Sequence, residues 1–440
     1  MCASARTAGQ TGAYNKIAMR ALVFLSVTFL PALYPQTATS PELATEFFNR
    51  TGMVPLKCQV RQIAPALDFG FRFHAGFALS VPFSQYRGDG HSWTVGLRIE
   101  PETGGPPVFL MDRLDLPPVH SNRLTAETNG EFLLGEGSYR ASLLVVDDEG
   151  RGCRAQWRYD AQLKPSDRPV KLAIAPGAIQ AVNAPVAFGP SPAAEPPVDK
   201  LTVFLDAAPV SPTLAGLHPG DAATLVTSLV SLMNQVPART VKLVVFNLDQ
   251  QIELYRQENF TLDQLDKVRR AISSLQLGVV AYRTLGNPNG YLDQLTDLAK
   301  EETGADSPSH LVVFMGAHSR FNGKPLADDA MERQGPGAPK FFYLEFLRPV
   351  ALPLAGDPAP DSWVDASSGA PGSALSSSDA LDYAEAVADA TALPSNYHPT
   401  QQDESRDAID HLISSLKGRT MIVRKPCDLA RAMLQITAAR

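Results

Sequence analysis

Apolar and polar side chains alternate with a period of two over much of residues 54–163, as they do in half-buried β-strands. Turn residues such as Gly88-Asp-Gly90 and Gly135-Glu-Gly137 separate the alternating runs. No helical period intervenes, so we predict an all-β sandwich domain over residues 48–164. The apolar parity of the runs is carried by Leu56, Cys58, Phe71, Phe73, Phe77, Trp93, Leu97, Leu143, Cys153 and Trp157.

From Leu201 onward the pattern changes to apolar strands that alternate with amphipathic helices. A helix begins at Asp221, and Thr261-Leu-Asp-Gln264 has the form of a capping box that opens another. Alternating strands and helices predict an α/β domain over residues 200–440, with a doubly wound, mostly parallel sheet. The predicted strands are 201–205, 241–247, 311–315, 341–346 and 420–423, and further helices are expected near 291–301, 405–417 and 427–436.

Two segments interrupt this organisation. Residues 165–199 contain a high density of proline, which predicts an extended linker between the two domains. Residues 348–378 mix Pro, Gly, Ala and Ser, a composition that predicts a disordered insertion in the second domain.

Two cysteines of the first domain, Cys58 and Cys153, lie on the core-facing parity of its first and last strands. They fit either a disulfide that ties the ends of the domain together or two buried free thiols. Cys427, at the start of the last predicted helix, is expected to be unpaired.

Two resemblances to known folds refine these expectations. The stretch Gly137-Ser-Tyr-Arg-Ala-Ser-Leu-Leu-Val-Val-Asp-Asp-Glu-Gly150 resembles a late strand and turn of immunoglobulin-like domains, which implies an immunoglobulin-like sandwich. Val241–Asn247, followed by Phe260-Thr-Leu-Asp and Ala271-Ile272, resembles the centre of a von Willebrand A domain. Residues 405–436 are similar to the end of related domains in secreted bacterial proteins. The resemblance to von Willebrand A domains covers about 200–347 and 405–436.

The second resemblance implies an ion site whose ligands this chain lacks. Asp206 supplies the carboxylate at a strand end, but Ala208 and Val210 stand where the family has hydroxyl ligands. Gly316-Ala-His-Ser319 replaces a further aspartate of the family. We therefore expect no metal and no cofactor in this domain.

A binding surface is still expected beyond the carboxyl ends of the strands, where open α/β sheets bind ligands. The candidates for a metal-independent contact with a protein or glycan are Asp206, Ser211, Asn289, His318 and Arg320. The alternative is that they are solvated loop residues, with Asp206 capping nearby backbone donors.

Charge and the N-terminal segment bear on partner and location. A net charge of -7 over 440 residues, without a basic stripe, argues against a nucleic-acid partner. Lys16 and Arg20 precede a short apolar run, Ala21–Leu33, so residues 1–40 are predicted to be a signal peptide; an N-terminal anchor or a buried helix is the alternative. No later segment is expected to span a membrane, so the mature protein is expected to be secreted or periplasmic.

Catalytic patterns are scarce, and no catalytic residue is proposed. Ser414-Ser-Leu-Lys417 matches S-x-x-K without its partner motifs. The sequence therefore favours an exported, non-enzymatic binding or adhesion protein. Two alternatives remain: a structural subunit of an envelope assembly, and a hydrolase whose pocket gathers His318 with a carboxylate and a hydroxyl.

Overall fold

The structure is a computed structural model that describes residues 37–38, 40–87, 90–116, 124–182, 198–209, 217, 219–277, 282–287, 289–303, 310–318, 338–347, 363–365 and 407–439. The apolar run of the predicted signal peptide lies outside these ranges. No helix among them is long and apolar enough to cross a membrane.

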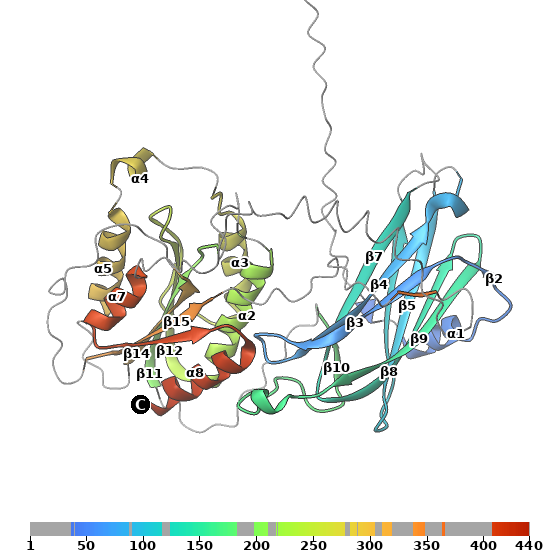
Figure 1. Cartoon of the computed structure of the whole chain (residues 1–440), viewed down its shortest axis with the longest axis horizontal. Helices are drawn as coiled ribbons and strands as arrows, with labels where there is room; N and C mark the ends of the chain where they lie inside the picture. Colours follow the sequence, from blue (N-terminus) through green and yellow to red (C-terminus); the bar gives the residue numbers. More distant parts are fainter. Residues whose placement is uncertain are drawn as a thin grey trace, which may run out of the picture. The chain divides into compact units, whose positions relative to one another are not determined.

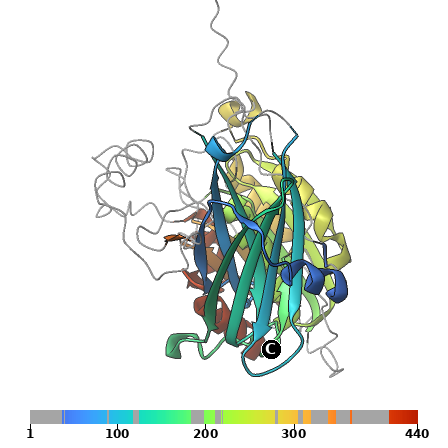
Figure 2. The same ribbon diagram turned by 90° about the vertical axis from the view of Figure 1, so that its right-hand side faces the viewer.

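The first half of the chain forms two β-sheets that share one hydrophobic core (Figure 2). The six-stranded sheet has the order β1-β6-β5-β8-β9-β2, and the five-stranded sheet has the order β10-β7-β4-β3-β16. Strand bounds are β1 (Thr37–Ala38), β2 (Val54–Pro55), β3 (Gln59–Leu67), β4 (Phe73–Pro82), β5 (Ser92–Pro101), β6 (Val108–Asp115), β7 (Thr125–Leu134), β8 (Gly137–Asp147), β9 (Arg151–Ala161), β10 (Ile179–Ala181) and β16 (Trp363–Asp365). The helices in this half are α1 (Pro41–Phe48), η1 (Phe83–Gln85) and η2 (Pro165–Asp167).

The period-two alternation explains this core. In β4, Phe73, Ala75, Phe77 and Leu79 are buried and join the cluster between the sheets, because alternate side chains of a strand point to one face. Trp93 of β5 is buried in the same cluster and donates its indole N–H to the Tyr86 hydroxyl at 2.8 Å.

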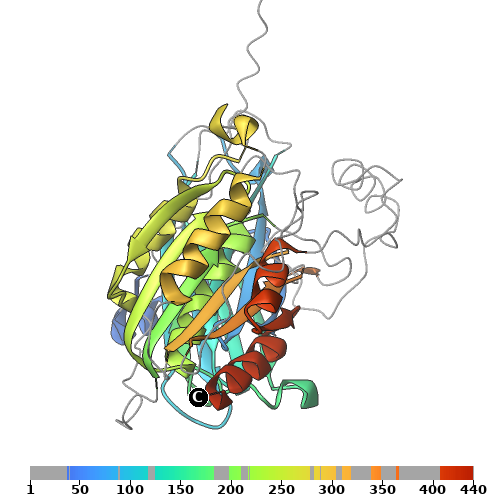
Figure 3. The ribbon, with the colours of Figure 1, turned by 90° about the vertical axis from the view of Figure 1, so that its left-hand side faces the viewer.

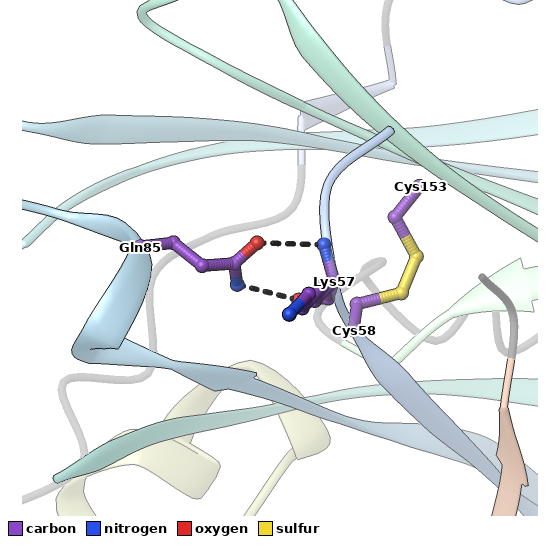
Figure 4. Close-up of a disulfide and its surroundings, with 4 residues drawn as sticks. All are labelled: Lys57, Cys58, Gln85 and Cys153. Atoms are coloured by element: carbon purple, nitrogen blue, oxygen red, sulfur yellow. Dashed lines mark hydrogen bonds between the residues drawn. A yellow bond between two sulfur atoms is a disulfide. The ribbon is translucent and has the colours of Figure 1, made fainter. Parts of the chain in front are cut away.

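A disulfide joins Cys58, which immediately precedes β3, to Cys153 of β9, so it links the two sheets (Figure 4). Of the two readings of these cysteines, the structure has the bonded one, with a Cα–Cα distance of 6.3 Å. The Gln85 side chain holds the neighbouring backbone, since it accepts from Lys57 N at 2.7 Å and donates to Lys57 O at 2.8 Å. Cys427 is a buried free thiol.

The boundaries of the predicted linker and insertion need correction. Strand β10 lies inside the expected linker, 165–199, yet it pairs with β7 and extends the five-stranded sheet. Strand β16 lies inside the expected disordered insertion, 348–378, and pairs with β3. Backbone pairing to an edge strand is not visible in composition, which is why both strands were missed. Residues 183–197 lie outside the described residues, and Gln36–Arg440 forms one compact unit.

The second half of the chain forms a six-stranded sheet with the order β13-β12-β11-β14-β15-β17. Only β13 is antiparallel to its neighbour, so the predicted mostly parallel, doubly wound sheet is confirmed. Its strands are β11 (Val198–Asp206), β12 (Ala238–Asn247), β13 (Ile252–Gln257), β14 (His310–Ala317), β15 (Lys340–Phe346) and β17 (Arg419–Val423).

Helices cover both faces of this sheet (Figures 1 and 3). Helices α5 and α7 share a core cluster with one face, whereas α2, α3 and α8 share a cluster with the other. The bounds are α2 (Pro219–Gln235), η3 (Leu262–Gln264), α3 (Leu265–Ser273), α4 (Tyr282–Gly286), α5 (Gly290–Thr303), α7 (Ala408–Ser415) and α8 (Pro426–Ala438). The two faces of β11 follow from its alternation, with Val203 and Leu205 on the α2 side and Phe204 on the α5 side.

The predicted capping box at Thr261–Gln264 is not formed. Thr261 precedes the short helix η3 and makes no side-chain cap, and its hydroxyl contacts Asp263 instead. The carboxylate two residues away is a closer partner for the hydroxyl than the backbone of the next turn.

Candidate functional site at the carboxyl edge of the α/β sheet

Three neighbouring parallel strands place Asp206, Gly316 and Glu345 in one row near their carboxyl ends. Between β11 and β14, Phe204 pairs with Phe314, so continuing this register by two residues brings Asp206 beside Gly316. Between β14 and β15, Met315 pairs with Leu344 and Gly316 with Glu345. A Cβ added to Gly316 would lie 2.8 Å from Asp206 Cβ. Side chains in one row of a parallel sheet share a face, so the glycine allows the Asp206 side chain to pack closely against β14 on the face that also carries Glu345.

Asp206 is fully buried, and only one of its carboxyl oxygens has a hydrogen-bond partner among the described residues. Leu248 N donates to Oδ1 at 3.3 Å, while Oδ2 has none. Burial raises the pKa of Asp206 well above its usual value, and the nearby charges of Asp249 and Asp407 raise it further. The neutral acid is thereby favoured, and the group lacks the pairing that buried carboxyls normally have.

His318 follows β14 directly and contacts two carboxylates. Its Nδ1 lies 2.6 Å from Glu345 Oε1 and 3.4 Å from Asp407 Oδ2. One ligand atom from each of these three residues lies within 4.8 Å of the others. The imidazole is partly exposed, but both acidic side chains are buried. We call these three residues the His318 cluster.

Both carboxyl oxygens of Asp407 accept hydrogen bonds. It is the N-cap of α7, where its Oδ1 accepts from Ile409 N at 2.7 Å and from Asp410 N at 3.4 Å. The Tyr343 hydroxyl lies 2.9 Å from Asp407 Oδ2 and 3.1 Å from Ala317 O. Burial and the charges of Asp407 and Glu345 raise the pKa of Tyr343 well above its usual value, so this phenol remains a proton donor.

Of the five candidates from the sequence, the structure places three. Asp206 and His318 lie at the same edge of the sheet, as expected. Asn289 is exposed just before α5. A hydrogen bond places this segment at the same edge: the backbone oxygen of Asn287, two residues earlier, accepts from Gln251 Nε2, which follows β12, at 2.9 Å. Ser211 and Arg320 lie outside the described residues.

Glu345, Asp407 and Tyr343 are the site residues that the sequence analysis missed. A signal for two of them was present, because a glutamate interrupts the apolar strand 341–346 two positions after a tyrosine, on the same face. Asp407 directly precedes an amphipathic helix and reads as an ordinary cap. Its proximity to His318 depends on a helix that returns to the sheet after about 60 residues of chain, which no local pattern reveals.

The metal site implied by the von Willebrand A resemblance lacks most of its ligands in this chain. Ala208 is buried and offers no oxygen from its side chain, and Val210 lies outside the described residues. The neutral acid favoured at Asp206 adds no charge. The His318 cluster is different, because an imidazole nitrogen and two carboxylate oxygens are donors that divalent transition metals accept.

Comparisons with known proteins add little to this picture. No family model matches the chain, and no curated protein matches it. Among solved structures, "von Willebrand factor type A from Catenulispora acidiphila" is 7% identical and matches 80% of this chain and 51% of its own, about half, with a TM-score of 0.28. A superoxide reductase (neelaredoxin) from Ignicoccus hospitalis is 12% identical and matches 24% of this chain and 80% of its own, with a TM-score of 0.17. The putative ApaA protein from Bordetella pertussis is 13% identical over 26% of this chain and 100% of its own, with a TM-score of 0.17.

TM-scores this low carry no argument about ancestry or function. The strand order and the helices on both faces are compatible with a von Willebrand A-like α/β fold on their own account. The immunoglobulin-like character of the sandwich stays a prediction.

Proposed function

We propose that this chain is an exported binding protein that recognises a protein or glycan by non-covalent contact at the carboxyl edge of its α/β sheet. The observation that supports this most is Asp206, a fully buried carboxyl group with an unpartnered oxygen beside the buried acids of the His318 cluster. Such groups lower stability, and unpaired or strongly perturbed ones gather at functional sites more than elsewhere.

The exposed residues at this edge supply a contact surface. Leu285 of α4 is 69% exposed, and its neighbour Thr284 holds α4 on the turn after β12 through Gln250 O at 3.4 Å. Asn289 and the partly exposed ring of His318 lie at the same edge. We call Leu285, Asn289 and His318 the crest surface. An exposed leucine among polar groups suits a partner contact.

An acidic groove continues from the crest surface and favours a basic partner. Gln251 and Asn287 line its upper end, and it runs between β13 and α5. Its charged lining residues are Glu253, Arg256, Asp293, Asp297 and Glu301. Arg256 pairs with Glu253 and Glu301, and Lys242 also contacts Glu301, so Asp293 and Asp297 supply the excess negative charge. This charge attracts Lys and Arg side chains, which favours a protein segment over a neutral glycan.

Recognition is preferred to nucleophilic catalysis because His318 is placed against two carboxylates, at 2.6 and 3.4 Å, and a nucleophilic mechanism also needs an accessible hydroxyl or thiol. The hydroxyl that belongs to this site, on Tyr343, is fully buried. Export is supported by the Cys58–Cys153 disulfide, since such bonds persist in oxidising compartments.

The test is capture of a partner from the exported fraction by the immobilised full chain. The purified partner is then titrated against the wild type and against Leu285→Arg and Asn289→Arg, which add bulk and positive charge to the crest surface. We expect each variant to weaken binding about tenfold or more, since loss of a central contact costs over ~1 kcal/mol. Leu434→Arg, on the exposed side of α8, is the matched control and should bind as the wild type does. Equal affinities for all four proteins would overturn the proposal.

A further inference from the structure

We propose that His318, Glu345 and Asp407 bind a divalent transition-metal ion of the Zn²⁺ class, at a site separate from the ion seat that the von Willebrand A resemblance implies at Asp206. The inference goes beyond partner recognition and concerns the purified chain alone. It rests on the donor set, on its supporting contacts, and on an independent property of Asp206.

The donors match in type and spacing. Zn²⁺ binds imidazole nitrogen and carboxylate oxygen at about 2.0–2.2 Å, which places tetrahedral donors about 3.4 Å apart. His318 Nδ1 and Asp407 Oδ2 are 3.4 Å apart. Nδ1 and Glu345 Oε1 are 2.6 Å apart, a distance for a shared proton, and this pair widens when an ion replaces the proton.

The donors are held by surrounding groups, as metal ligands usually are. The amide groups at the start of α7 fix one oxygen of Asp407, and the Tyr343 hydroxyl lies 2.9 Å from the other. The same hydroxyl lies 3.1 Å from Ala317 O, in the residue before His318. One buried phenol thus links the segments that carry two of the three donors, and Glu345 lies on β15, which pairs with β14 on one side and β17 on the other.

Asp206 gives the independent observation. It is fully buried, its Oδ2 is unpartnered among the described residues, and it lies in the row of Glu345, with Gly316 between them. It lies close enough to Asp407 and Tyr343 for their charges to affect one another. Two buried carboxylates beside one histidine form a site that is short of positive charge, and a bound dication supplies it.

The geometry also leaves a free coordination position. Glu345 and Asp407 are 10% and 2% exposed at their side chains, but His318 is 30% exposed. Three protein donors on a tetrahedral ion leave the fourth position for water or an incoming donor atom.

The experiment is a calorimetric titration of the purified full chain with Zn²⁺ after treatment with chelator, repeated with Co²⁺ to record the absorption of a tetrahedral complex. We expect one ion per chain. Glu345→Gln and Asp407→Asn should each weaken binding by about 100-fold or more, since loss of even a supporting partner costs 10–100-fold. Asparagine also caps helices, so Asp407→Asn keeps the start of α7.

His91→Gln is the matched control, because His91 Nδ1 also lies close to a carboxylate, 3.1 Å from Asp148 Oδ2, in the sandwich. It should bind Zn²⁺ as the wild type does. As a second readout, Zn²⁺ should raise the melting temperature of the wild type but not that of Glu345→Gln. If Asp407→Asn does not fold, the comparison of the wild type with Glu345→Gln is sufficient to test the proposal. The proposal is overturned if the wild type takes up no ion, or if Glu345→Gln binds as tightly as the wild type. If the chain binds Zn²⁺ as expected but captures no partner, the proposed recognition function is overturned and the proposed metal site stands.

Discussion

Glu302 shows how one buried carboxylate can be surrounded by basic side chains. It lies in the last turn of α5, near the amino ends of the strands, and is completely buried. Lys200 and Lys242 approach it at 2.9 and 2.8 Å, and His310 Nε2 lies 3.0 Å away. These partners lower the pKa of Glu302 far below its usual value in spite of its burial. This end of the sheet is stabilised by charge pairing, in contrast to the edge that holds Asp206.

Glu302→Gln is expected to lower the free energy of unfolding by about 3 kcal/mol at pH 7, because it removes the buried carboxylate charge that Lys200, Lys242 and His310 contact. A carboxyl group with a depressed native pKa stabilises the fold above its unfolded pKa, near 4.3, and this contribution disappears as the pH falls. The difference between wild type and variant should therefore shrink below about pH 4. Urea unfolding across this range measures it.

Glu258→Gln is the control, since Glu258 contacts the same Lys242 at 3.4 Å from an exposed position. It should cost under ~1 kcal/mol. A loss for Glu302→Gln no larger than that of Glu258→Gln would contradict the account of this network.

Asp206→Asn should have the opposite effect. The raised pKa of Asp206 means that the native state keeps the proton at a pH where the unfolded chain has lost it. Wild-type stability therefore falls as the pH rises above ~4, by about 1.4 kcal/mol for each unit of pKa difference. An asparagine cannot ionise, so the variant should be more stable than the wild type at pH 7 in buffer with chelator. Thermal unfolding from pH 4 to 8 tests this, and a variant that is less stable at every pH would refute it.

The contact between β11 and β14 depends on a glycine. Because a Cβ on Gly316 would meet Asp206 Cβ at 2.8 Å, Gly316→Ala should destabilise the α/β part by about 1–3 kcal/mol. Gly286, at the end of α4, has no atom within 4 Å of an added Cβ. Gly286→Ala should therefore change stability by less than ~1 kcal/mol, and equal effects of the two substitutions on chemical denaturation would contradict the close packing of this row.

The disulfide closes a long loop, since its cysteines are 95 positions apart in the sequence. Replacing both Cys58 and Cys153 by serine should cost about 4 kcal/mol through the added freedom of the unfolded chain. Thiol titration of the exported protein, unfolded without reductant, should find one thiol, that of Cys427. Three thiols before reduction would show that the bond is absent.

Local sequence patterns predicted the elements well where the period was strong. The alternation in β4 and the apolar runs of β11, β12 and β14 gave the correct element types and sheet class. Strands β10 and β16 were missed because each has only three residues and is defined by its neighbour. The false capping box at Thr261 has a different cause, since a nearby aspartate competes for the hydroxyl.

The candidate site was predictable only in part, because it is assembled from distant segments. The positions of Asp206 and His318 followed from the rule that strand ends meet at one edge. Predicting that His318 lies beside Glu345 and Asp407 requires the strand order and the return of α7 to the sheet. Neither can be read from the local sequence pattern. The general lesson is physical: strand-end residues can be located from period alone, but the partners of a buried charge depend on tertiary packing.

The charge distribution of the whole molecule leads to one more expectation. The acidic groove and the net charge of -7 should make partner binding weaken with salt, since exposed charges are screened over about 8 Å at physiological ionic strength. Affinity should fall severalfold between 50 and 500 mM NaCl, roughly as expected for electrostatic attraction. An affinity that rises with salt would indicate an apolar contact instead.

Site-specific photo-crosslinking tests the proposed recognition at the crest surface most directly. A photoreactive amino acid is placed at position 285 in one full-length protein and at position 434 in another, and each is irradiated with the captured partner. We expect a covalent adduct from position 285 and none from position 434. An adduct from position 434 alone, with the partner bound equally by both proteins, would place the contact away from the crest and contradict the proposal.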